Sequence, residues 1–176
     1  MDFSGLQMVE WSPGKDHGLL FGLWHLMQTE GKAQHYCQIS DHRQWTIQQW
    51  GEDCCLKHRQ KRRRIFITFS KGYVAFMTQV DNYRPHRAEA HWCTFSAAGR
   101  RLIDIGVFSA KSIIEKMSLE VLYGFTPAHN TRAIEYLQRI GGTVCGMLPG
   151  GSYQAIGDQN HDSALIAFKR GFHENL

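Results

Sequence analysis

The stretch from Gly124 to Gly142 reads GFTPAHNTRAIEYLQRIGG and carries the strongest local pattern in the chain. Asn130 precedes a short amphipathic run, and Asn often caps a helix by accepting a hydrogen bond from a free backbone N–H. Gly141 follows the run and suits the left-handed turn that ends many helices. The stretch therefore predicts the end of a strand, a turn at Pro127, a capped helix and a sharp stop.

The segments around this stretch alternate between strand and helix patterns. Strands are expected at 6–11, 64–70, 73–81, 89–96, 118–125, 143–150 and 163–171, and helices at 13–31, 40–54 and 97–117. Lys71 and Gly72 predict a tight hairpin turn between two of the strands. Because no linker or repeat interrupts this order, the sequence predicts a single α/β domain over residues 1–176.

The composition fits a protein with one hydrophobic core, because 43% of its 176 residues are hydrophobic. No apolar run approaches the roughly 20 residues that span a bilayer, and the N-terminus lacks a signal-peptide pattern. The number of cysteines is odd and none follow C-x-x-C spacing, so we expect reduced thiols and no metal site. The five cysteines are Cys37, Cys54, Cys55, Cys93 and Cys145.

Much of the net charge of +4 lies in one basic run, KHRQKRRR, from Lys57 to Arg64. Such a run can neutralise nucleic-acid phosphates, so DNA contact is one interpretation. The other is a solvated loop and strand start, and it is favoured because no aromatic residues interleave with the cations.

The order of these elements resembles the GNAT (Gcn5-related N-acetyltransferase) fold over nearly the whole chain, with a mixed central sheet flanked by helices. Members often carry an Asn after the fifth strand, an Ala three residues later and a small residue where the helix stops. Here these positions are Asn130, Ala133 and Gly141. The resemblance implies that the strand before Asn130 opens a cleft for the thioester arm of acetyl-CoA.

The resemblance also implies a pyrophosphate site at the start of the long helix, in SAAGRR. The family pattern there is Gln or Arg, two residues, Gly, one residue, then Gly or Ala. Gly99 matches the first glycine, but Ser96 and Arg101 depart from the pattern. Either Arg101 crowds the site, or Arg100 and Arg101 bind the phosphates through their guanidinium groups. The departures favour a weakened site, so the sequence predicts weak or no binding of acetyl-CoA.

The residues that would move protons match the family only in part. Many members use a Tyr seven residues after the Asn to protonate the departing thiolate, and here that residue is Leu137. Tyr136 comes one residue earlier, which turns it by roughly 100° on a helix. Glu89 and His91 alternate onto one strand face, and either is a candidate base for the attacking amine. A polar strand face in solvent is the plainer interpretation of this pair.

An intact fold with a partial site resembles the degenerate GNAT-like proteins of tailed bacteriophages, some of which are internal virion or head-assembly proteins. This resemblance implies a non-catalytic role in virion assembly or DNA ejection, without a cofactor. Its partners would be other virion or assembly proteins, and its location the host cytoplasm or the virion. The alternative is an acetyl-CoA-dependent N-acetyltransferase with an atypical pyrophosphate loop. The sequence leaves open whether the protein is an enzyme.

Overall fold

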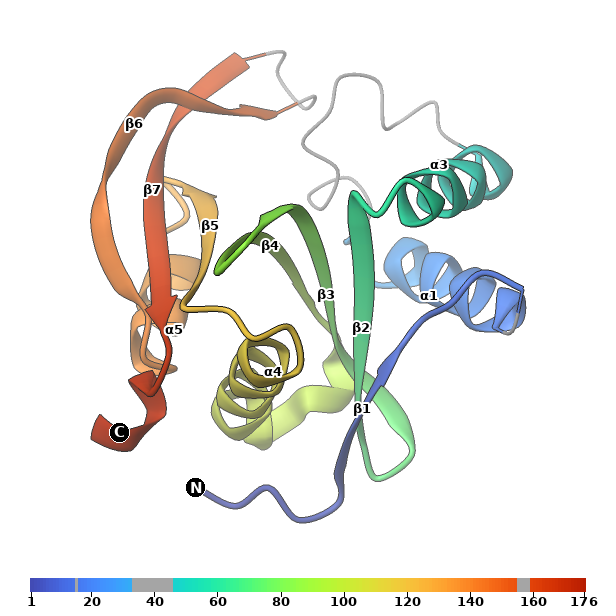
Figure 1. Ribbon diagram of the computed structural model, residues 1–176, viewed down its shortest axis with the longest axis horizontal. Coiled ribbons are helices and arrows are strands. Elements are labelled where there is room, and N and C mark those ends of the chain that lie inside the picture. The colour runs from blue at the N-terminus through green and yellow to red at the C-terminus, as the bar shows by residue number, and fades with distance from the viewer. Residues whose placement is uncertain (15, 33–45, 155–158) are drawn as a thin grey trace.

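The computed structural model describes residues 1–14, 16–32, 46–154 and 159–176, and within these residues seven strands form one sheet. The strand order is β1-β2-β3-β4-β5-β7-β6, with helices packed on the sheet (Figure 1). The strands are β1 Leu6–Glu10, β2 Arg63–Ser70, β3 Tyr73–Arg84, β4 Arg87–Thr94, β5 Val121–Pro127, β6 Thr143–Gln154 and β7 Gln159–Lys169. The helices are α1 His17–Thr29, α3 Ile47–Arg59, η2 Ser96–Arg101, α4 Leu102–Lys116, α5 Thr131–Arg139 and η3 Phe172–Asn175. The predicted α/β class is confirmed.

The sheet is mixed, because β4 and β5 run parallel whereas each other neighbouring pair is antiparallel. Parallel neighbours need a long crossover connection. Here η2 and α4 supply it, where the sequence predicted a helix at 97–117. The parallel pairing is short, joining Arg87–Glu89 to Val121–Tyr123.

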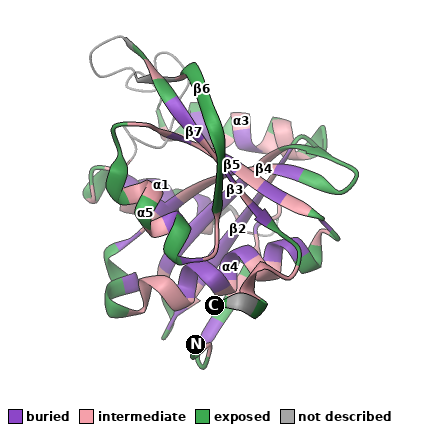
Figure 2. Ribbon diagram, turned by 90° about the vertical axis from the view of Figure 1, so that its left-hand side faces the viewer, coloured by how far each residue is buried: buried purple, intermediate pink, exposed green. Residues whose placement is uncertain are grey.

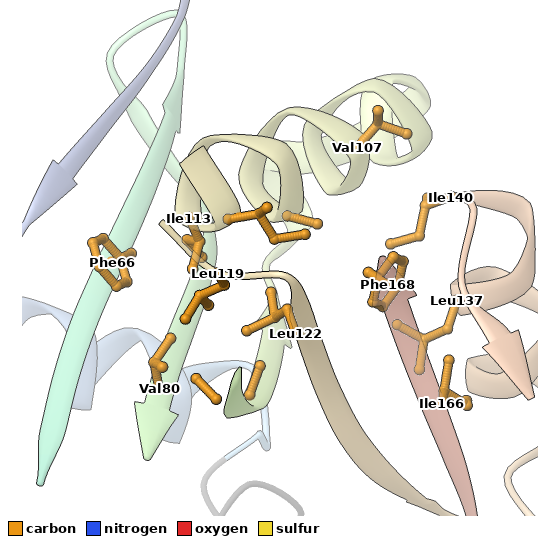
Figure 3. Close-up of a cluster of buried hydrophobic side chains, with 14 of the residues drawn as sticks. Phe66, Val80, Val107, Ile113, Leu119, Leu122, Leu137, Ile140, Ile166 and Phe168 are labelled. Atoms are coloured by element: carbon orange, nitrogen blue, oxygen red, sulfur yellow. The ribbon is translucent and has the colours of Figure 1, made fainter. Parts of the chain in front are cut away.

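Apolar side chains cover both faces of the sheet. On one face, α4 and α5 pack over a cluster that includes Phe66, Ile113 and Phe168 (Figure 3). On the other face, α1 and α3 pack over a second cluster that includes Trp50 and Ile67. Neighbouring residues of β2 point to opposite faces, since successive side chains of a strand alternate. The helices therefore form a layer on each side of the sheet.

The predicted helix at 40–54 lies further along the chain. α3 begins after Thr46, whose hydroxyl accepts from the Gln49 N–H while the Gln49 side chain accepts from the Thr46 N–H. This reciprocal pair forms a capping box. Ser40 and Asp41, either of which could cap a helix that begins at residue 40, lie outside the described residues. Because α3 ends at Arg59, the first part of the basic run is helical rather than a loop.

A hairpin turn and an exposed edge strand complete the fold. Lys71 and Gly72 have φ values of 53° and 83°, which the predicted tight hairpin requires. β6 is one of the two edge strands, with β1 at the opposite edge, and residues 143–150 are exposed along β6 (Figure 2). None of the helices in the described part of the chain is long and apolar enough to cross a membrane.

Candidate functional site

β4 and β5 part soon after they pair. The last paired residues are Glu89 and Tyr123, yet β4 continues to Thr94 and β5 to Pro127. Gly124 lies where the strands part, and a Cβ there would be 2.6 Å from the Ala90 carbonyl oxygen and 2.6 Å from a ring carbon of Trp92. Glycine at this position therefore lets the indole ring lie at the base of the gap.

A cavity of about 550 Å³ opens in this gap. Its size lies within the usual range for small-molecule sites, which is roughly 300–1,000 Å³. The wall includes residues 90–94 of β4 and 125–127 of β5, and it continues over the start of α5. Lys32, after α1, and Leu102, at the start of α4, complete the lining. Segments far apart in the sequence thus meet around one hollow.

The start of α5 forms one wall of the cavity, and its cap matches the sequence prediction. The Asn130 side chain accepts a hydrogen bond from the Ala133 N–H at 3.2 Å. Gly141 ends the helix with a φ of 96°, which is the left-handed conformation expected for it. Both predicted helix signals are confirmed.

We expect Asn130→Ala to lower the free energy of unfolding by about 1 kcal/mol, because the first turn of α5 loses its cap. Urea unfolding would measure this loss as a lower midpoint, with the dependence of the free energy on urea concentration unchanged. Asn130→Asp is the matched control, since aspartate also caps helices and should retain most of the stability. Equal midpoints for Asn130→Ala and the parent protein would show that the cap contributes nothing.

The loop before α4 turns at Gly99, which has a φ of 48° and a ψ of −133°. The carboxylate of Glu30 accepts from the Ser96 N–H at 3.0 Å and from the Ser96 hydroxyl at 2.7 Å. The Glu30 carboxylate is therefore already bound to the first residue of the loop. Arg100 is exposed beside it.

Arg101 makes a contact that neither interpretation of the sequence included. Its guanidinium donates to the carbonyl oxygens of Asp2 at 2.8 Å and Ser4 at 3.0 Å. The side chain therefore lies against the N-terminal segment, and its crowding or binding of a phosphate stays a prediction. Sequence reasoning missed this direction because it considered only the loop itself.

Glu89 and His91 lie on one face of β4, as predicted, but the solvent interpretation of this face is wrong, because the Glu89 side chain is only 14% exposed. The His91 side chain is 18% exposed, and its Nε2 lies 3.5 Å from Glu89 Oε1 and 3.8 Å from Asp81 Oδ2. Burial lowers the pKa of His91 below its ordinary value, despite the attraction of these two carboxylates. The imidazole is therefore neutral at pH 7, and it lines the cavity.

Tyr136 lines the cavity although it comes one residue before the expected position. Its hydroxyl donates to the Leu102 carbonyl oxygen at 3.2 Å, and burial raises its pKa, so it stays protonated. Gly106 of α4 leaves the space for this hydroxyl, because a Cβ there would overlap it. Leu137, at the expected position, is buried and also reaches the cavity wall.

No protein-family model matches this sequence, and no curated protein matches it. Solved structures do match. The spermidine N-acetyltransferase from Vibrio cholerae, solved with CoA and spermine, has a TM-score of 0.77 at 14% identity, and the match covers 98% of this chain and 99% of that chain. The ribosomal-protein-S5-alanine acetyltransferase from Vibrio fischeri has a TM-score of 0.71 at 12% identity, covering 97% and 96%. An acetyltransferase from Salmonella typhimurium that modifies the N-terminal serine of ribosomal protein L7/L12 has a TM-score of 0.73 at 12% identity, covering 94% and 95%.

The chain has the GNAT fold. The predicted fold class is therefore confirmed over nearly the full length. The sequence resemblance linked three features of this fold to acetyl-CoA. They are the parting of β4 and β5, the loop at Gly99 and the capped start of α5. The structure brings two of them together, since β4, β5 and α5 share one cavity.

We expect Gly106→Ala to destabilise the protein, although alanine usually stabilises a helix interior by about 0.5–1 kcal/mol relative to glycine. The new Cβ would overlap the Tyr136 hydroxyl and lie 3.0 Å from Ile140, and overpacking of this kind costs about 1–3 kcal/mol. Thermal and urea unfolding would measure the net loss.

Gly22 of α1 provides the matched control, because no heavy atom lies within 4 Å of its added Cβ. Gly22→Ala should therefore be stabilising. The second substitution Tyr136→Phe removes the overlapping hydroxyl and should reduce the cost of Gly106→Ala. If Gly106→Ala alone did not lower the stability, that result would contradict the close packing of α4 on α5.

Internal ion pairs take up half of the six lysines and arginines in the basic run from Lys57 to Arg64. Lys57 pairs with Asp53 at 2.9 Å, and Arg64 pairs with Glu10 at 2.6 Å. Arg63 pairs with both Asp53 and Asp81 at 2.8 Å. Because these three cations form ion pairs within the fold, fewer positive charges of the run are available to bind DNA phosphates. DNA contact through this run stays a prediction.

Several residues of the cavity escaped the sequence analysis. Lys32 and Arg132 bring positive charge to its wall, and Trp92 closes its base. Arg132 was detectable, because it follows the predicted cap in the exposed first turn of a helix. Lys32 carried no signal, since only the packing of α1 beside the sheet brings it to β4. Among the described residues, no cluster of three His, Cys, Asp or Glu side chains is placed to hold a metal ion.

Proposed function

We propose that this protein is an N-acetyltransferase that binds acetyl-CoA between β4 and β5 and transfers the acetyl group to an amine. The observation that carries the proposal is the cavity of about 550 Å³ where the two parallel strands part. Residues 1–176 would form one domain around this cleft. An atypical pyrophosphate loop, with Glu30 bound to Ser96, distinguishes it from the family pattern.

The cleft suits an extended thioester arm. Beyond Glu89, no strand of the described chain pairs with the edge of β4 that faces β5. Backbone N–H and C=O groups on such an edge can bind an extended ligand as a further strand would. Lys32 and Arg132 on the wall, together with Arg100 in the loop, supply positive charge for the phosphates of CoA.

Two side chains of the cavity can move the protons of the reaction. Neutral His91 can accept a proton from the amine as its nitrogen attacks the thioester carbonyl, and the nearby Glu89 stabilises the imidazolium that forms. The C–S bond then breaks, and the CoA thiolate takes up a proton. Tyr136 is the candidate donor because it lines the cavity and its hydroxyl stays protonated; to donate, the hydroxyl must leave the Leu102 carbonyl oxygen. Leu137 has no proton to give.

The proposal predicts that acetyl-CoA binds the intact protein with one molecule per chain, as measured by titration calorimetry. Release of free CoA should follow when an amine is added. The first acceptors to test are spermidine and peptides that begin with serine or alanine, because the similar structures act on polyamines and protein N-termini. Glu30→Gln should tighten binding, since it removes a negative charge beside the loop.

Binding too weak to detect in both the parent protein and Glu30→Gln would exclude the acetyltransferase. That outcome would favour the non-catalytic scaffold, for which Leu137 at the proton-donor position is the supporting observation. The bacteriophage role has no support from the similar structures, which are N-acetyltransferases. Virion partners, DNA contact and the expected location stay predictions from the sequence.

A further inference from the structure

We infer that Trp92 limits the length of the acyl group that the cleft accepts, which makes acetyl-CoA and not a longer acyl-CoA the donor. This inference rests on the proposed function. The cleft has two ends, because β4 pairs with β5 up to Glu89 and leads into the loop at Ser96–Arg101 at its other end. A donor whose phosphates lie at the loop would point its acyl group toward the paired end. Trp92 and Gly124 lie there.

The indole ring of Trp92 is fixed from several sides. Its ring carbon Cζ3 occupies the space beside Gly124, where any side chain would collide with it. The ring of Phe168 contacts it edge-to-face, with centroids 5.5 Å apart and an angle of 70°. Phe168 is itself fully buried and packs against Phe172 at 5.3 Å. Because cores are close-packed, the indole cannot swing away without displacing these neighbours.

A fixed ring at the closed end of the cleft discriminates by size. Tyr136 and Leu137 line the same cavity from α5. In a pocket of this kind, one additional methylene changes binding or rate by about tenfold or more. Butyryl-CoA carries two more methylenes than acetyl-CoA and would meet the indole. The structure thus favours acetyl transfer over transfer of longer chains.

The test compares CoA, acetyl-CoA and butyryl-CoA by titration calorimetry, without an acceptor, in the parent protein and in Trp92→Leu. The parent should bind acetyl-CoA at least about tenfold more tightly than butyryl-CoA. Trp92→Leu should reduce that preference by about tenfold and leave the affinity for CoA itself unchanged, because CoA carries no acyl group. Trp92→Phe, a smaller change that keeps an aromatic ring, should give an intermediate preference if Trp92→Leu does not fold.

Trp50→Leu is the matched control. It makes the same change at a fully buried tryptophan in the cluster on the other face of the sheet, outside the cavity wall, so it should lower stability while keeping the preference for acetyl-CoA. An unchanged preference in Trp92→Leu and Trp92→Phe, with CoA still bound, would overturn this inference and leave the acetyltransferase intact. A parent protein that binds none of the three ligands would overturn the proposed function and this inference together.

Discussion

Replacing Arg63 by alanine is expected to lower the free energy of unfolding by about 3–5 kcal/mol, because it leaves partly buried carboxylates without their cation. Arg63 is only 6% exposed. Its Nε and Nη2 donate to the two carboxylate oxygens of Asp81, and its Nη1 donates to Asp53, each at 2.8 Å. Urea unfolding would measure the loss.

The neighbouring Arg62 provides the control for this substitution. It is exposed, so Arg62→Ala should change stability by less than about 0.5 kcal/mol. Arg63→Lys keeps the charge but loses the paired geometry, so its stability should lie between the stabilities of Arg63→Ala and Arg62→Ala. If Arg63→Ala were as stable as Arg62→Ala, the ion pairs would have no net stabilising effect.

The same ion pairs make stability depend on pH. Burial alone would raise the pKa of Asp81, but the hydrogen bonds and charge of Arg63 outweigh it and hold the pKa below its usual range. A carboxylate with a lowered pKa contributes stability above its unfolded value of about 3.9, and that stability is lost as the pH falls further. The loss below about pH 4 should be smaller in Arg63→Ala than in the parent protein.

Replacing His91 by alanine is expected to lower kcat about 100-fold, a typical contribution of a general base. The affinity for acetyl-CoA should change little, because in the proposed reaction His91 accepts a proton from the amine and does not act on the donor. Since burial lowers its pKa, the imidazole is the free base at neutral pH. The rate of the parent protein should therefore fall only at a pH below the ordinary histidine value of about 6.5.

Added imidazole separates a catalytic role from a structural one. It should restore part of the rate in His91→Ala, because the truncation leaves space next to Glu89 for a free base. Glu89→Gln is the companion variant, and it should reduce kcat less, since Glu89 only stabilises the imidazolium. An unchanged kcat in His91→Ala would move the role of base to Glu89.

The sequence predicted the fold and the α5 signals because both depend on local patterns. Periodic apolar residues identify strands and helices, and a cap such as Asn130 lies directly beside the helix that it caps. The order of these elements was then enough to select the fold. Boundaries shifted by a few residues where a cap went unrecognised, as at Thr46.

The site was harder to predict because its contacts join distant segments. The basic run looked solvated, since nothing nearby in the sequence shows that Arg63 meets Asp81 on the next strand. The position of Tyr136 on its helix suggested that it points away from the cleft. Gly106, thirty residues earlier, leaves room for the Tyr136 hydroxyl against α4, and in this position the Tyr136 side chain lines the cavity.

The exposed strand β6 has a practical consequence for work in solution. It carries Val144, Met147 and Leu148 on the rim of the sheet, 37%, 56% and 46% exposed, and the strand contains no charged residue. An uncharged apolar rim with unpaired backbone groups is a template onto which another extended chain can add. Pro149 interrupts this template because it has no N–H to donate. Aggregation of concentrated samples would therefore begin at residues 143–148. A lysine introduced there should keep the protein dispersed, and since β7 separates β6 from β5, it would not enter the cavity wall.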